Sequence, residues 1–340
     1  MTRLLIIRFS AMGDVAITVP VIHSLASRYP ELRITVLTQS RFSAFFDWMP
    51  ANVEVKGINL SDYPGIWGLS RLFSQLKSCQ YDYVADLHDV LRTKYLRTCF
   101  RMMGTKTAVI NKARSEKRML IERRMETKNL KPMVERYADV FRELGYDLNV
   151  DFARAFDPRQ ENFARVRNVV GGKQDGETWI GVAPFAAHKG KIYPLESMHK
   201  VVDMLSDRGF RIFLFGAGKE ETAILESWER EGVTSICGKL GGLHNEMLLM
   251  SRMNLMITMD SANMHIASIA AVPTVSVWGA THPKMGFMGW GQSEDSAIQQ
   301  NLPCRPCSVY GNKPCKYGDY RCLTGIAPEK IVEKVVNMLG

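Results

Sequence analysis

Short apolar runs alternate with segments of helical period along most of the chain. The first run, Leu4–Phe9, is interrupted only by Arg8 and is typical of a strand buried on both faces of a parallel sheet. Val15–Arg28 then repeats apolar positions at helical spacing, and Tyr29-Pro30 ends that helix. Further strands are expected at Arg33–Leu37, Val53–Ile58 and Tyr83–Leu87, and helices at Trp67–Lys77 and Met133–Leu144. This alternation predicts a doubly wound α/β sheet.

The pattern begins again after Asp157–Gly176, which contains Pro158 and Gly171-Gly172 and is expected to link two domains. The second set comprises strands at Trp179–Ala183, Arg211–Phe215 and Ser235–Cys237, and helices at Leu195–Arg208, Glu220–Glu231 and Leu243–Arg252. We therefore expect two Rossmann-like domains facing across a cleft, at residues 1–160 and 175–327. A final helix at 328–340 can pack on either domain.

The stretch Met256–Val277 reads as strand, turn, helix and strand. Asp260 or Ser261 is placed to cap the helix, and the small Ser261 and Ala262 allow a ligand close to the backbone. Free N–H groups and the helix dipole favour an anion there, which predicts a phosphate site. His265 lies about one turn further on, where it faces either the ligand or the core.

Length and composition indicate a globular protein of two ordinary domains. The chain has 340 residues, of which 46% are hydrophobic and 23% charged. No apolar run reaches the roughly 18 residues of a membrane-spanning helix. The basic and apolar start resembles a signal peptide, but Arg8 and Asp14 interrupt it. We therefore expect a cytoplasmic protein.

The formal charge of +9 is unevenly distributed. Lys112–Lys131 carries eight Lys and Arg against three Glu. This stretch is either a solvated helical face or a cradle for an anionic partner, which is a nucleic acid, a membrane surface or an acidic acceptor. No zinc finger, aromatic RNA-binding motif or helix-turn-helix accompanies it, which disfavours nucleic acid.

Four of the seven cysteines cluster near the end of the chain, at Cys304, Cys307, Cys315 and Cys322. Zinc sites use paired close spacings of thiolates, so the cluster invites a zinc interpretation. The second pair is six residues apart in the chain, which is loose for a zinc ribbon. We favour a reduced, buried cluster over zinc binding.

Several common nucleotide sites are absent from the sequence. Gly216-Ala217-Gly218 lacks the third glycine of a dinucleotide fingerprint, and no GxxxxGK[ST] loop occurs, which disfavours dehydrogenases and P-loop enzymes. No Asp-x-Asp pair is present to chelate a metal–diphosphate complex. A bound diphosphate therefore needs the protein's own cations and helix dipoles.

Lys191 is the best candidate cation, because it follows the first strand of the second domain, and Lys189 is its rival. Glu220 either binds a ribose diol or complements a helix dipole. Asp14 is either a functional carboxylate or a plain helix-start acid. Asp14 and Asp86–Arg92 follow strands of one sheet, so we expect them to share a cleft.

Together these motifs resemble glycosyltransferase family 9, the ADP-heptose:lipopolysaccharide heptosyltransferases. RFSAMGD at Arg8–Asp14 is similar to the family's RFSxxGD signature, and DLHDVLR at Asp86–Arg92 to its DLhxxxR segment. KIYP at Lys191–Pro194 fits K-x-W/Y-P, and DSANMHIA at Asp260–Ala267 fits D-[TS]-G-x-x-H-x-A. Cys304–Cys322 resembles a Cys-rich tail of many members. The resemblance covers nearly the whole chain.

The resemblance implies a GT-B architecture and an inverting, metal-independent transfer of heptose from ADP-heptose, without a cofactor. It implies that Asp14 is the base and that Lys191 binds phosphate and Glu220 ribose. The nucleotide sugar would be held further by Asp260, Ser261, Ala262 and His265. The acceptor would be bound by Arg8, Ser10, Asp86, His88, Arg92, Arg118 and Arg123.

The implied acceptor is an anionic lipopolysaccharide inner-core glycolipid, met by peripheral contact at the cytoplasmic face of the inner membrane; no nucleic acid is expected. Ala262 departs from the family's glycine, and its methyl group either narrows the pocket or forbids a positive φ. The donor sugar therefore stays open. The alternatives are transfer of another sugar, a GT-B-like epimerase, and a non-catalytic protein that binds a nucleotide sugar or an anionic surface.

Overall fold

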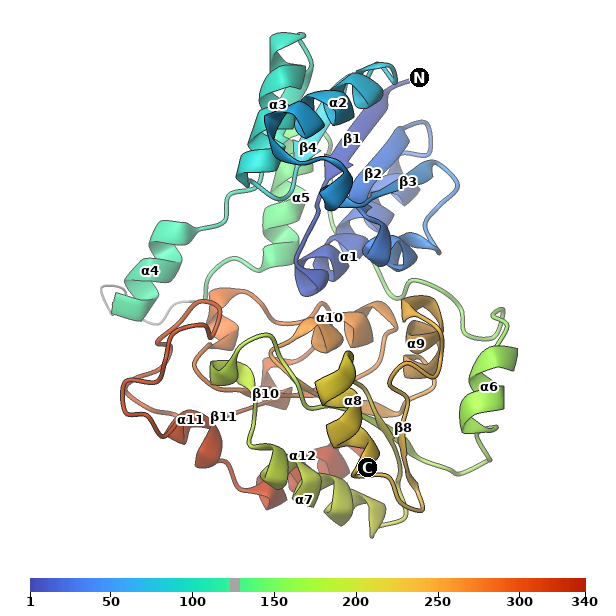
Figure 1. Ribbon diagram of the computed structural model, residues 1–340, viewed down its shortest axis with the longest axis vertical. Helices are drawn as coiled ribbons and strands as arrows, with labels where there is room; N and C mark the ends of the chain where they lie inside the picture. The colour runs from blue at the N-terminus through green and yellow to red at the C-terminus, as the bar shows by residue number, and fades with distance from the viewer. Residues whose placement is uncertain (123–128) are drawn as a thin grey trace. The chain divides into compact units, whose positions relative to one another are not determined.

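The structure is a computed structural model that describes residues 1–122 and 129–340 (Figure 1). Contacts divide the chain into two compact units. The first comprises Met1–Lys112 and Met133–Ala155, and the second Ala113–Pro132 and Phe156–Gly340. Among the described residues, no helix is both long and apolar enough to cross a membrane.

A parallel sheet of five strands forms the centre of the first unit, in the order β3-β2-β1-β4-β5. Its strands are β1 (Arg3–Ile7), β2 (Arg33–Gln39), β3 (Val53–Ile58), β4 (Tyr83–Asp86) and β5 (Lys106–Val109). Its helices are α1 (Met12–Arg28), α2 (Gly65–Lys77), α3 (Leu91–Met102) and α5 (Met133–Leu144), with 3-10 turns at Ser40–Phe46 and Leu60–Asp62. Leu5 and Ile7 of β1 share a core with α2 and α3. Leu4 and Ile6 point to the other face, because side chains alternate along a strand.

The second unit contains a parallel sheet of six strands, in the order β11-β10-β9-β6-β7-β8. The strands are β6 (Trp179–Ala183), β7 (Arg211–Leu214), β8 (Val233–Ser235), β9 (Leu255–Met259), β10 (Thr274–Trp278) and β11 (Ala297–Gln299). The helices are α4 (Arg114–Glu122), α6 (Ala164–Val170), α7 (Leu195–Ser206), α8 (Lys219–Glu226), α9 (Leu243–Met250), α10 (Ala262–Ile269), α11 (Arg321–Thr324) and α12 (Pro328–Leu339). Short 3-10 turns occur at Lys189–Lys191, Pro283–Met285 and Glu294–Ser296. The central strands β6, β9 and β10 are wholly buried, as their uninterrupted apolar character predicts.

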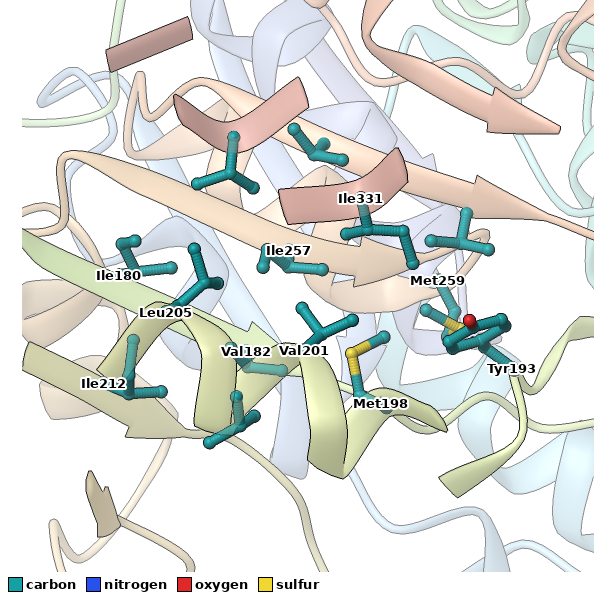
Figure 2. Close-up of a cluster of buried hydrophobic side chains, with 14 of the residues drawn as sticks. Ile180, Val182, Tyr193, Met198, Val201, Leu205, Ile212, Ile257, Met259 and Ile331 are labelled. Carbon is teal, nitrogen blue, oxygen red and sulfur yellow. The ribbon is translucent and has the colours of Figure 1, made fainter. Parts of the chain in front are cut away.

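The C-terminal helix α12 packs in the second unit, which decides between the two positions left open by the sequence. Ile331 of α12 lies among side chains of α7, β6 and β9, including Val201, Val182 and Ile257 (Figure 2). The buried members Ile331, Val332 and Val335 recur at helical spacing, so α12 presents one apolar face to this core.

Two parts of the chain differ from the sequence-based expectation. The expected link at 157–176 contains α6, whose Val166 and Val170 are buried. The basic stretch was expected within the first domain, 1–160, but Ala113–Pro132 belongs to the second unit. Leu120 and Leu130 pack with Met285, because these apolar side chains outweigh the local positive charge in deciding where the stretch lies.

Candidate active site

Asp14 lies in the first turn of α1, immediately beyond the carboxyl end of β1. Its Oδ2 accepts from the backbone N–H of Ala11 (3.3 Å) and pairs with Arg8 Nη2 at 2.7 Å. The Asp14 side chain is 31% exposed, whereas that of Arg8 is 5% exposed. Arg8 also donates to the Leu87 carbonyl (2.6 Å). A nearly buried, doubly held guanidinium therefore fixes one oxygen of a carboxylate that a substrate can still reach.

His88 lies beside this pair. Burial, with the positive charges of Arg8 and Lys112, lowers the pKa of His88 to about 3. The imidazole is therefore neutral at physiological pH, and one ring nitrogen is free of a proton. Its Nε2 lies 3.4 Å from Ser10 Oγ. The first unit thus brings Arg8, Ser10, Asp14 and His88 together beyond the carboxyl ends of β1 and β4.

Asp86 shapes the loop that carries His88. Its buried carboxylate accepts from the backbone N–H groups of His88 and Asp89, both at 2.9 Å, and from Arg97 Nη1 at 2.7 Å. Asp86 was predicted to bind the acceptor, but the contacts it makes in the structure hold the loop. The sequence analysis did not single out Arg97, which lies in the second turn of α3. Arg92 is exposed in the first turn of α3.

Of the two remaining predicted acceptor residues, only Arg118 is described, and it lies on α4 in the second unit. Arg118 is 77% exposed on α4 and pairs with Glu122 at 2.7 Å. It belongs to the second unit, together with the rest of Ala113–Pro132. Arg123 lies outside the described residues, so its role stays a prediction.

In the second unit, Lys191 Nζ pairs with Asp260 Oδ2 at 3.0 Å, and Thr281 Oγ1 donates to the same oxygen at 2.7 Å. Lys191 follows β6 and Asp260 follows β9, which are neighbours in the sheet. Their side chains are 18% and 6% exposed. The rival lysine is placed differently, because Lys189 Nζ lies over the Tyr320 ring, 5.3 Å from its centroid. Of the two lysines, Lys191 is the one held at the expected phosphate site.

The start of α10 agrees only in part with the expected capping. Ser261 occupies the N-cap position, but its hydroxyl makes no capping hydrogen bond, and Asp260 pairs with Lys191 instead. Within the described part of the chain, the buried Ser261 Oγ has no hydrogen-bond partner. A buried donor without a partner is costly unless a ligand satisfies it. The α10 N-terminus therefore retains polar groups for an anion.

Ala262 answers one question that the sequence left open, and the exposure of His265 bears on another. Ala262 is the first residue of α10 and is not among the residues with positive φ, so the backbone here does not require glycine. Only the space taken by its methyl group remains as a difference from the family motif. His265 is 7% exposed, so it lies largely inside the second unit.

Two adjacent glutamates follow the glycine turn after β7. Glu220, the predicted ribose ligand, is exposed in the first turn of α8. Glu221, which was not singled out, accepts from the backbone N–H of Ala217 at 2.8 Å. Glu221 thus stabilises the turn and leaves Glu220 accessible to a ligand.

The Cys-rich segment packs against the Lys191 loop, which the sequence did not predict. Arg305 donates to the carbonyls of Gly279 and Thr281, the latter at 2.8 Å. Ala280, between them, donates from its N–H to the Gly190 carbonyl at 2.8 Å. Gly311 lies against the stem of Lys191, so closely that a Cβ there would be 2.4 Å from Lys191 Cγ. This segment therefore supports both Lys191 and Thr281.

The four clustered cysteines are free thiols. Burial raises the pKa of Cys322 to about 11 and also raises that of Cys307, so both are protonated at neutral pH. In the described ranges, no three His, Cys, Asp or Glu side chains are grouped so as to hold a metal ion.

A pair of glycine substitutions tests the support of Lys191. Gly311 and Gly318 have φ of +75° and +77°, so alanine at either strains the backbone by a similar amount. Only at Gly311 does the new methyl group collide with Lys191. Gly311→Ala is expected to weaken binding of a diphosphate, with pyrophosphate as the probe, about tenfold in calorimetry, and Gly318→Ala less than twofold. Equal losses in both variants would assign the effect to general destabilisation, which melting temperatures measure in parallel.

Comparison with known proteins places this chain in a family. Residues 69–318 match the model of glycosyltransferase family 9 (heptosyltransferase). Lipopolysaccharide heptosyltransferase 1 of Pseudomonas aeruginosa is 23% identical over 99% of this chain and 98% of its own length. The relationship therefore extends over both units.

Solved structures show the same fold. A family 9 glycosyltransferase from Veillonella parvula aligns with a TM-score of 0.74 at 20% identity, over 99% of this chain and 97% of its own. The Escherichia coli heptosyltransferase WaaC aligns with a TM-score of 0.67 at 18% identity, over 100% of both chains. These alignments and the two parallel sheets confirm the two-domain α/β fold of the GT-B class. The chain belongs to glycosyltransferase family 9, the heptosyltransferase family, and is a glycosyltransferase.

Proposed function

We propose that this glycosyltransferase moves a heptose from ADP-heptose to an anionic inner-core sugar of lipopolysaccharide, with inversion at the anomeric carbon. The observation that carries the proposal is Lys191, held by Asp260 beside the uncapped start of α10. A cation and free helix N–H groups at one sheet edge suit a diphosphate. The structure of the E. coli enzyme WaaC with ADP-2-deoxy-2-fluoro heptose supports this choice of donor.

The donor diphosphate would be stabilised by the protein alone. Lys191 supplies the positive charge, and the Ser261 hydroxyl and the first N–H groups of α10 supply donors. As the bond between the anomeric carbon and the phosphate oxygen breaks, ADP leaves with the electron pair. The growing negative charge on ADP is what these groups offset. The exposed Glu220 carboxylate accepts from the ribose hydroxyls.

Asp14 would act as general base on the acceptor. An acceptor hydroxyl attacks the anomeric carbon on the face opposite ADP, and Asp14 takes its proton as the new bond forms. Arg8 keeps one Asp14 oxygen occupied and so presents the other to the hydroxyl. The neutral His88 and Ser10 are placed to hydrogen-bond the same acceptor sugar, and the exposed Arg92 to pair with its acidic groups. One displacement inverts the anomeric centre.

The acceptor is anchored in lipid, so we propose that the enzyme works in the cytoplasm, at the membrane surface. The basic stretch Lys112–Lys131 is less suited to contact with the membrane surface than its positive charge alone suggests. Lys117 is 3% exposed, with Nζ 4.1 Å from the centroid of the Phe287 ring. Arg118 is exposed and remains a proposed acceptor contact. A donor with another sugar is the second candidate, because Ala262 alters the space at the α10 start.

A transfer assay in EDTA tests the proposal. ADP-heptose with an inner-core acceptor should yield ADP and an inverted heptosyl product, identified by mass and by nuclear magnetic resonance of the anomeric proton. Activity in EDTA should stay within about twofold of that in Mg²⁺, since the sequence has no Asp-x-Asp pair. ADP-glucose and UDP-glucose serve as donor controls.

Three outcomes would contradict parts of this function. Transfer from a control donor in place of ADP-heptose would reassign the sugar, and retention of the anomeric configuration would exclude a single displacement. Loss of activity in EDTA that Mg²⁺ or Mn²⁺ restores would refute metal independence. Restoration by iron would instead relate this chain to the iron-containing heptosyltransferase TibC. A fall in melting temperature with activity retained would indicate a structural metal at the cysteines.

A further inference from the structure

Helices α2 and α3 of the first unit lie side by side and run in the same direction (Figure 1). Ser70 and Tyr95 share a hydrogen bond of 2.5 Å, and the rings of Phe73 and Phe100 meet at 5.0 Å. Ile66 lies four residues before Ser70, and Leu91 lies four residues before Tyr95, which is about one helical turn in each helix. The N-terminal turns of the two helices are therefore neighbours.

These two N-terminal turns expose large apolar side chains. Leu91 is 87% exposed, Trp67 85% and Ile66 59%. Single exposed apolar residues are ordinary, but three on adjoining turns form a patch. Met102 and Met103, at the far end of α3, are 82% and 60% exposed. The start of α2 and both ends of α3 thus expose apolar side chains.

The same two helices carry only positive charge. Between them, Gly65–Lys77 and Leu91–Met102 contain no Asp or Glu. Their basic residues are Arg71, Lys77, Arg92, Lys94, Arg97 and Arg101. Arg97 pairs with Asp86, Lys94 with Asp89 at 3.7 Å, and Arg71 donates to the Asp62 carbonyl. Lys77, Arg92 and Arg101 are exposed. A helical face that combines Trp, aliphatic and basic side chains is typical of helices that lie in a bilayer interface.

We propose that the outer face of α2 and α3 docks on an anionic phospholipid bilayer. Trp67, Ile66 and Leu91 enter the interfacial region, where tryptophan is enriched, and Lys77 and Arg101 pair with lipid phosphates. The absence of acidic residues from both helices is the charge complementarity that selects a bilayer over a neutral protein partner.

The position of this face also suits the proposed function, on which this step rests. Helices α1, α2 and α3 follow β1, β3 and β4, so all three begin at the carboxyl edge of the first sheet. Asp14 lies at the start of α1. Docking along the outer face of α2 and α3, which includes the starts of both helices, therefore brings the edge that bears Asp14 close to a membrane-anchored acceptor.

Vesicle co-sedimentation of the full chain, without donor or acceptor, tests the docking. Binding to vesicles of phosphatidylglycerol and phosphatidylcholine should exceed binding to phosphatidylcholine alone and decline with salt. The double variant Trp67→Ser, Leu91→Ser should bind at least tenfold more weakly and stay salt-sensitive. The double variant Lys77→Gln, Arg101→Gln should bind about thirtyfold more weakly, from about 1 kcal/mol per charge, with a flatter salt dependence.

The matched control is Lys200→Gln, Lys330→Gln, which removes the same charge from exposed lysines of α7 and α12 in the second unit. It should bind like the parent chain. Equal loss in the control, or no preference for phosphatidylglycerol, would overturn the proposal. Self-association that disappears in Trp67→Ser, Leu91→Ser, without vesicle binding, would assign the face to a second copy instead.

Activity separates this proposal from the proposed function. Transfer to an acceptor without acyl chains should be unchanged in both α2–α3 variants, because they alter no residue of the Asp14 cluster. Normal vesicle binding without heptosyl transfer would refute the function and leave the docking intact. Normal heptosyl transfer without vesicle binding would refute the docking and leave the proposed function intact.

Discussion

Asp14→Asn should lower kcat by about 10²–10⁴-fold, the usual contribution of a general base, while the Kd for ADP changes less than twofold. The base acts only as the acceptor hydroxyl attacks, so its loss affects the transition state rather than donor binding. The asparagine keeps one amide oxygen that accepts from Arg8, so the fold around the buried guanidinium should survive. Single-turnover kinetics and calorimetry with ADP measure the two quantities.

Asp147→Asn is the matched control. Asp147 also pairs with an arginine of α1, because its Oδ2 lies 2.5 Å from Arg28 Nη2, but both side chains are largely exposed. This variant should retain nearly full activity. Turnover of Asp14→Asn close to that of the parent would reduce Asp14 to a helix-start acid that only complements the α1 dipole.

Lys191→Ala should weaken ADP and ADP-heptose binding about 10–100-fold, since a hydrogen bond to a charged group contributes about 1.5–3 kcal/mol. The loss has two physical sources. The diphosphate loses a cation, and the Asp260 carboxylate, 6% exposed, loses its Lys191 partner and faces the ligand's negative charge. Calorimetric Kd values for ADP measure the combined effect.

Two further variants separate these sources. Lys191→Ala with Asp260→Asn removes the repulsion, so binding should recover in part but stay weaker than in the parent. Lys189→Ala should change the Kd less than twofold, because Lys189 lies over Tyr320. If Lys189→Ala and Lys191→Ala weaken binding equally, the phosphate site has been assigned to the wrong part of the loop.

Lys191 and Asp260 could be predicted from the sequence, because each of them follows a buried strand. Strands such as β6 and β9 can be recognised in the sequence by their runs of buried residues. Because the strands are parallel, the residues that follow them lie at the same edge of the sheet. The same reasoning placed Asp14 and His88 together in the first unit. The sequence also predicted the two Rossmann-like domains and the membership of the family.

Residues that act through distant contacts carried no such signal. Arg305 and Gly311 support Lys191 across more than a hundred residues of sequence, and Thr281 reaches Asp260 from beyond β10. Helix α3 escaped detection because its apolar positions are few among arginines and threonines, and β5 and β11 are only 4 and 3 residues long. Short edge strands bury too little apolar surface to produce a recognisable repeat of hydrophobic residues in the sequence.

The sequence by itself determined the alternation of strands and helices, the two sheets, and the identity of the charged residues at their edges. Local patterning suffices for these, since a buried strand or an amphipathic helix must repeat its apolar positions. The tertiary structure alone decided the place of the basic stretch, whose charge suggested a free anion-binding surface. Leu120 and Leu130 bury themselves against Met285 in the second unit, because burial of apolar area outweighs solvent-screened charge. It likewise showed that exposed basic side chains gather on α2 and α3, two successive helices that pack side by side.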